Sequence, residues 1–178
     1  MVAETASEPT RRSFIYIATG TLGALGAATI AWPLVDQMNP SADVLALSTT
    51  KVPLGSIAVG QQVTVMWRGH PVFIRHRTAK DIEEADAVDV NTLRDPQADD
   101  KRVVEFSGAL MKEWLVLVGV CTHLGCIPKP DTGGDSAWLC PCHGSHYDTS
   151  GRIRRGPAPQ NLAVPPYKFT SATEILIG

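Results

Sequence analysis

Two short segments, C-T-H-L-G-C at residues 121–126 and C-P-C-H-G-S at residues 140–145, decide how this chain is interpreted, because all four of its cysteines lie inside them. We call them box 1 and box 2. Each offers one Cys and one His as metal ligands, two positions apart in box 1 and three apart in box 2. These four candidates are Cys121, His123, Cys140 and His143. Two thiolates and two imidazoles suit either a tetrahedral zinc ion or an iron–sulfur cluster in which two His replace two Cys.

The order of the ligands distinguishes these two kinds of site. Zinc fingers with two Cys and two His pair like with like, as C-x2-4-C followed by H-x3-5-H. Here each box mixes Cys with His, and Cys126 and Cys142 are left over. A tetrahedral zinc ion gives that extra pair no role, so the pattern favours the cluster. A structural zinc module is the non-redox alternative.

The complete pattern, C-x-H-x-x-C with C-x-x-H around an embedded second Cys, resembles the high-potential Rieske [2Fe–2S] proteins. The resemblance implies one [2Fe–2S] cluster and a disulfide between Cys126 and Cys142 that ties the two loops together. The implied ligands are Cys121 and Cys140 on one iron, and His123 and His143 on the other.

The same resemblance gives two neighbouring residues, Ser145 and Tyr147, a role. In the high-potential subgroup, the residues at the positions of Ser145 and Tyr147 donate hydrogen bonds to a bridging sulfide and to a cysteine ligand sulfur, which tunes the potential. Coordination through one ring nitrogen leaves the other nitrogen of His123 and His143 to carry a proton, so these two are the candidate catalytic residues. Leu124, directly after the second ligand of box 1, would supply an apolar docking contact.

Composition describes a folded protein in an oxidising compartment. The chain has 178 residues, 44% hydrophobic and 19% charged, which suits one domain or slightly more. Its net charge of −2 excludes a strongly basic nucleic-acid binder. A disulfide forms outside the cytoplasm, so we expect the boxes to lie in the periplasm of a bacterium.

The N-terminus predicts how the chain reaches that compartment. Thr10-Arg-Arg-Ser-Phe-Ile15 places an Arg pair before an apolar run, which resembles a twin-arginine export signal. That pathway exports folded proteins, as a cluster assembled in the cytoplasm requires. The alternative is that Arg11 and Arg12 only keep this end of the apolar segment in the cytoplasm, as positive charges beside membrane helices commonly do. Residues 1–12 are thus expected to form a cytoplasmic arm, with Met1–Pro9 disordered.

Residues 13–36 are expected to form a single transmembrane helix in the bacterial inner membrane. No charged residue occurs between Ser13 and Val35, a length that spans a bilayer. A cleaved signal peptide is the alternative, but the run exceeds a typical h-region and no clear A-x-A site follows. Pro33 should kink or end the helix.

Beyond the helix we expect a flexible hinge over residues 37–51 and an all-β domain over 52–178, with the cluster-binding subdomain at about 115–160. Asn39-Pro40-Ser41 breaks the helix, and many short apolar segments between Gly and Pro turns then predict strands. The resemblance implies stacked antiparallel sheets with one helix–loop insertion. The expected elements are a hairpin at 63–74, a helix at 79–88, a polar loop at 91–101, a strand at 114–120, a turn-rich loop at 127–136 and strands at 167–170 and 174–177.

The resemblance covers nearly the whole chain, including the W-R-G-H-P-V-F-I-R-H-R-T stretch at residues 67–78, and is to the Rieske subunits of ubiquinol–cytochrome c reductases. It implies that the cluster takes one electron from ubiquinol, with proton transfer through a ligand His, and passes it to a c-type cytochrome. Cytochrome b and cytochrome c-type subunits of a dimeric membrane complex are the implied partners. One alternative is the small Rieske subunit of an exported molybdenum oxidase such as arsenite oxidase. Another is a soluble Rieske ferredoxin, although the apolar segment Ser13–Val35 argues against it.

Overall fold

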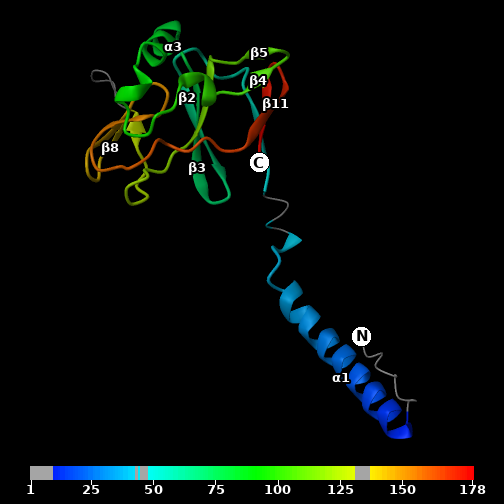
Figure 1. Ribbon diagram of the computed structural model, residues 1–178. Helices are drawn as coiled ribbons and strands as arrows, with labels where there is room; N and C mark the ends of the chain where they lie inside the picture. The colour runs from blue at the N-terminus through cyan, green and yellow to red at the C-terminus, as the bar shows by residue number, and fades with distance from the viewer. Residues whose placement is uncertain (1–9, 43, 45–47, 131–136) are drawn as a thin grey trace, which may run out of the picture. The chain divides into compact units, whose positions relative to one another are not determined.

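The structure is a computed structural model that describes residues 10–42, 44, 48–130 and 137–178 (Figure 1). The chain divides into two compact units, residues 1–45 and residues 46–178. The expected disorder of Met1–Pro9 lies outside the described residues. So do residues 43 and 45–47 of the expected hinge and the Gly133-Gly134 turn.

The first unit contains helix α1 (Arg11–Asp36), which is long and apolar enough to cross a membrane. It begins two residues earlier than expected, because Thr10 caps it by accepting a hydrogen bond from the Ser13 N–H. Pro33 does not end the helix, which continues to Asp36 and closes with a bond from the Gln37 N–H to the Pro33 carbonyl. None of the residues of α1 is buried, as suits a helix that meets lipid.

The described residues of the second unit form three antiparallel sheets and a two-stranded ribbon, which confirms the predicted all-β fold. The first sheet has the order β1 (Thr50–Pro53), β12 (Glu174–Ile177), β11 (Tyr167–Ser171). The second has the order β2 (Gln62–Trp67), β3 (His70–His76), β6 (Trp114–Val118). The third has the order β10 (Ile153–Arg155), β9 (Ser145–Tyr147), β8 (Trp138–Cys140), β7 (Lys129–Pro130). The ribbon pairs β4 (Glu105–Phe106) with β5 (Ala109–Leu110).

The sheet β2-β3-β6 lies between two hydrophobic cores, and Figure 1 shows β8 and β11 on opposite sides of β3. Side chains of a strand alternate between its two faces. Leu115 and Leu117 of β6 accordingly enter the core beside box 1 and box 2, whereas Trp114 and Val116 enter the core beside β11 and β12. A strand buried on both faces needs a continuous apolar run, which explains the sequence W-L-V-L-V.

An insertion between β3 and β6 carries the expected soluble helix, α3 (Ala79–Asp86). Thr78 and Asp81 form a capping box at its start, in which each side chain accepts from the other residue's backbone N–H. Two 3-10 turns follow, η1 (Val90–Thr92) and η2 (Asp99–Lys101). The predicted polar loop is therefore partly helical, and α3 ends two residues before the predicted boundary.

Two further predicted boundaries are wrong. Thr50 and Lys51 were assigned to the hinge, but they pair with Ile177 and Leu176 as the first residues of β1. A strand of four residues is too short to show a clear alternation of apolar and polar residues. The strand that it pairs with also lies at the far end of the chain. The strand expected at 114–120 ends at Val118, where β3 ceases to pair with it.

Candidate metal centre

Box 1 and box 2 are both tight loops closed by backbone hydrogen bonds. In box 1, the Gly125 N–H bonds the Cys121 carbonyl at 2.9 Å and the Cys121 N–H bonds the Cys126 carbonyl at 2.8 Å. Box 2 is the hairpin between β8 and β9, and its Gly144 N–H bonds the Cys140 carbonyl at 3.0 Å. Gly125 and Gly144 have φ values of +81° and +68°, which other residues adopt at a cost.

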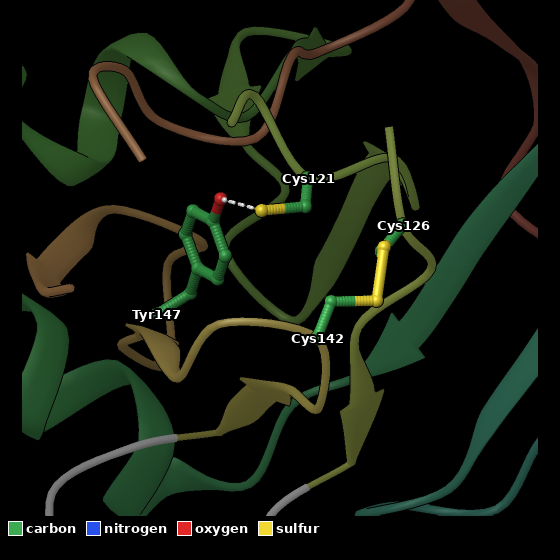
Figure 2. Close-up of a disulfide and its surroundings, with 4 residues drawn as sticks. All are labelled: Cys121, Cys126, Cys142 and Tyr147. Atoms are coloured by element: carbon green, nitrogen blue, oxygen red, sulfur yellow. Dashed lines mark hydrogen bonds between the residues drawn. A yellow bond between two sulfur atoms is a disulfide. The ribbon is translucent and has the colours of Figure 1, made fainter. Parts of the chain in front are cut away.

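A disulfide joins the two loops. Cys126 and Cys142 are bonded through their sulfurs with their Cα atoms 6.6 Å apart, the pairing that the resemblance implied (Figure 2). The sulfur of Cys140 lies within 4.8 Å of both disulfide sulfurs. The bridge therefore packs directly beside one of the two free thiols and holds box 1 against box 2.

The structure brings the four candidate ligands together in pairs. Cys121 and Cys140 are free and buried, and each thiol affects the pKa of the other. The rings of His123 and His143 meet edge to face, with their centroids 4.7 Å apart. The Nδ1 atom of His123 is buried and has no hydrogen-bond partner. An unpaired buried ring nitrogen is costly, so this atom fits a metal ligand better than a structural histidine.

The surroundings of Cys121 favour its thiolate form. Burial alone would raise the pKa of Cys121, but hydrogen bonds from the Tyr147 hydroxyl, the His123 backbone N–H, Cys140 and Ser145 outweigh it and lower the pKa. The thiolate is the form that binds metal. The pKa of Cys140 is raised, chiefly by its burial and also by the adjacent thiol of Cys121.

Ser145 and Tyr147 lie on the Cys121 side of the centre. The Tyr147 hydroxyl donates to the Cys121 sulfur at 3.2 Å, and Figure 2 shows its ring pointing at that atom. Burial and this contact raise the pKa of Tyr147, so its hydroxyl stays protonated and donates. Ser145 is fully buried and accepts a hydrogen bond from the Ala158 N–H at 3.1 Å.

The residues expected at the tip are the accessible ones. Leu124 is 71% exposed and His143 is exposed, whereas His123 is half-buried. Leu124, the residue after His123, thus presents an apolar side chain to solvent.

Sequence reasoning missed how the rest of the domain supports the centre. The 156–161 loop, G-P-A-P-Q-N, contacts both boxes. Thr122 of box 1 exchanges hydrogen bonds with the backbone of Gln160, and Ser145 of box 2 accepts from Ala158. The signal available was the pair of prolines at 157 and 159, which marks a rigid loop without saying what it touches.

A buried ionic network beside the centre was also missed. Arg77 and Asp99 form a salt bridge at 2.7 Å with both side chains fully buried. Arg152 pairs with Asp148 at 2.8 Å, and Arg102 donates to the carbonyls of Ser150 and Leu162. The contacts of Arg102 join the insertion to the turn after β9. No spacing in the sequence marks the contacts of Arg77 and Arg102, because their partners are 22 to 60 residues away.

Comparison with known proteins agrees with this geometry. A family model described as "Rieske [2Fe-2S] domain" matches residues 56–167, and one described as "Ubiquitinol-cytochrome C reductase Fe-S subunit TAT signal" matches residues 1–41. The ubiquinol-cytochrome c reductase iron-sulfur subunit of Rhodospirillum rubrum is 56% identical over 96% of this chain and 93% of its own length. The subunit of the same name from Bradyrhizobium diazoefficiens is 53% identical over 99% of this chain and 98% of its own length.

A solved structure described as a hyperthermophilic respiratory complex III is also similar. It is 27% identical, covers 90% of this chain and 98% of its own, and superposes with a TM-score of 0.53. The similarity in sequence and in fold therefore extends from the N-terminal helix through both boxes.

Proposed function

Because this chain belongs to the family of Rieske iron–sulfur subunits of ubiquinol–cytochrome c reductase, we propose that it carries electrons from ubiquinol to a c-type cytochrome within that complex. The observation that carries the proposal is that two loops joined by a disulfide carry two buried free thiols and two imidazole rings in edge-to-face contact. Cytochrome b and cytochrome c1 type subunits are the proposed partners, in a dimeric complex.

The residues fit one [2Fe–2S] cluster. Cys121 and Cys140 would hold one iron and His123 and His143 the other, with the unpartnered Nδ1 of His123 as one ligand atom. When bound, the cluster supplies a one-electron carrier at a potential that neutral imidazole ligands raise. Tyr147 and Ser145 orient hydroxyl hydrogens toward the sulfur side of the site, and the disulfide holds the two loops closed.

The histidine rings provide the proton acceptor. If Nδ1 holds iron, Nε2 is the atom left to meet the substrate. His143 is exposed, so its Nε2 can accept a hydrogen bond and then the proton of a quinol hydroxyl. Leu124, which follows His123 and is exposed, would contact the apolar walls of the site where the quinol is held.

We further propose that α1 anchors the chain in the bacterial inner membrane. Arg11 and Arg12 at its start place that end in the cytoplasm, and the cluster domain then lies in the periplasm. The small residues between Pro40 and Thr49 would form a hinge on which the domain moves between its electron donor and its acceptor.

The alternative, the Rieske subunit of an exported molybdenum oxidase such as arsenite oxidase, is not favoured. The relatives that match nearly the whole chain carry the name of the ubiquinol–cytochrome c reductase subunit.

The deciding experiment is an EPR redox titration on membranes that contain the full chain, with and without inhibitors of the quinol-oxidation site. The proposal expects a Rieske signal whose shape or potential changes when the inhibitor binds. A Rieske signal that no quinol-site inhibitor changes would contradict the quinol-oxidising role and support the molybdenum-oxidase alternative.

A further inference from the structure

The 156–161 loop presses against the backbone of box 2. Gly156 has a φ of +101°, and a Cβ atom there would lie 2.5 Å from the Ser145 Cα and 2.6 Å from the Gly144 carbonyl oxygen. Ala158 stands between two prolines, which have no N–H. The backbone N–H of Ala158 is therefore the donor in the Pro157–Pro159 segment, and it donates a hydrogen bond to the Ser145 hydroxyl at 3.1 Å.

This contact limits what the Ser145 hydroxyl can do. A hydroxyl has one donor hydrogen and two acceptor lone pairs. Ala158 uses an acceptor position, so the hydrogen remains for the side that faces Cys121. Ser145 is fully buried, and linked hydrogen bonds polarise one another. The bond that Ser145 accepts from Ala158 therefore strengthens the one that it donates.

Arg94, from the insertion, holds the loop in place. Its Nη1 atom donates to the Gly156 carbonyl at 2.7 Å and to the Ala158 carbonyl at 2.5 Å. Two carbonyls two residues apart thus converge on one charged donor. The Ala158 N–H lies in the short segment between these carbonyls, so this cation fixes the direction of the donor. Asp95 holds the other end by accepting from the Asn161 N–H at 2.9 Å.

We infer that Arg94 is a positioning residue that raises the reduction potential of the centre through the Ala158 N–H and the Ser145 hydroxyl. The inference rests on the proposed function, because it presupposes a cluster at the two boxes. A hydrogen bond to sulfur favours the more negative, reduced state. If the loop loosens, Ala158 no longer directs the Ser145 hydrogen and that stabilisation weakens.

Arg94 also carries a positive charge, which by itself would favour the reduced state. Two comparisons separate charge from position. The first is Arg94→Gln in the wild-type background and in a Ser145→Ala background, since the second lacks the hydroxyl but loses the same charge. The second is Lys112→Gln, which removes a cation that pairs with Asp86 and Asp100 instead of the loop.

The experiment measures potentials by EPR titration of the full chain in membranes and amide exchange of the peptide that contains Ala158. Arg94→Gln should lower the equilibrium constant for reduction about threefold to tenfold, which is about 30–60 mV for a one-electron couple. That shift should largely vanish in the Ser145→Ala background, and the Ala158 amide should exchange faster. Lys112→Gln should leave the potential unchanged.

Equal shifts in both backgrounds, or an equal shift from Lys112→Gln, would reduce Arg94 to a surface charge and overturn the inference. An unchanged potential in Arg94→Gln would overturn it too. The amplitude of the Rieske signal shows in each variant that the cluster is present, independently of its potential. A wild-type chain without that signal would contradict the proposed function itself.

Discussion

The two faces of the sheet β2-β3-β6 pack against cores with different requirements. The face toward β11 and β12 covers an apolar core in which Ile74, Val116 and Ile175 are fully buried. The other face packs against a core that also contains Cys121 and Cys140. Two buried ion pairs, one formed by Arg77 with Asp99 and one by Arg152 with Asp148, belong to the same side of the domain. One side needs only volume and hydrophobicity. The other must fix the direction of individual donors and thiols, so its residues depend on specific partners.

The largest expected effect is the loss of a ligand. Cys121→Ser, His123→Ala, Cys140→Ser or His143→Ala should each abolish the Rieske EPR signal, because any loss opens the coordination shell of an iron. Far-UV circular dichroism should show that the sheets on the opposite face persist. A variant that keeps a normal signal would remove its residue from the ligand set.

Breaking the buried ion pair should cost the most stability. Asp99→Asn leaves Arg77 charged and unpaired in the interior, which we expect to destabilise the domain by about 3–5 kcal/mol in urea unfolding. Replacing both partners, as Arg77→Met with Asp99→Leu, should cost less than Asp99→Asn alone. If both variants lose the same stability, the pair itself is not what matters.

The same pair predicts a dependence on pH. Burial alone would raise the pKa of Asp99, but the hydrogen bond and charge of Arg77 outweigh it and hold the pKa below its usual value. A depressed folded-state pKa stabilises the fold above the unfolded value of about 3.9 and loses that contribution as pH falls below it. Wild-type stability should thus drop more steeply below about pH 4 than that of the double variant.

Removing the disulfide should weaken the site without removing the cluster. Cys126→Ser or Cys142→Ser leaves all four ligands in place but frees the two loops, and a bridge closing a loop of this length contributes about 3 kcal/mol. The cluster should assemble and then decay faster than in the wild-type protein. The loss of the EPR signal over time measures this decay. Thiol labelling of the unfolded, unreduced protein provides the check, because four labelled cysteines would show that no bridge exists.

The hydroxyls of Tyr147 and Ser145 should change the reduction potential of the cluster without being needed for its assembly. Tyr147→Phe and Ser145→Ala each delete a donor toward sulfur, and a hydrogen bond to a charged group contributes about 1.5–3 kcal/mol. Only the difference between the two redox states enters the potential, so each variant should lower it by on the order of 50–100 mV. Unchanged potentials in both would show that the hydroxyls act elsewhere.

The smallest effect belongs to the opposite face. Ile74→Val removes one methyl group from the apolar core and should cost about 0.5–1.5 kcal/mol of stability. Because that core touches no expected ligand, the potential should not change. A shift as large as that of Tyr147→Phe would erase the distinction between the two faces.

Much of the site could be predicted from sequence because its ligands are local. Cys121 and His123 share one loop, Cys140 and His143 share another, and the family resemblance then related the two loops. The strands were predictable where alternation or continuous burial leaves a pattern, as in Trp114–Val118. The start of β1 was not, because a strand that pairs with the far C-terminus carries no local signal.

The supporting contacts could not be predicted for a related reason. Arg94 and the carbonyl of Ala158 are 64 residues apart, and nothing in an Arg within a polar loop tells which backbone group it meets. Arg77 and Asp99 likewise appear as ordinary surface charges in the sequence, although both side chains are fully buried in the fold. Such pairs exist only once the insertion has folded back onto the site.

The most direct test of the central claim is pulsed EPR of the reduced centre in protein labelled with 15N only at histidine. Coordination by His123 and His143 predicts couplings from two strongly bound histidine nitrogens, and uniform labelling should add only weak couplings from the surrounding backbone. A reduced cluster without histidine nitrogen couplings, or a centre that gives no EPR signal and contains zinc, would contradict the assignment.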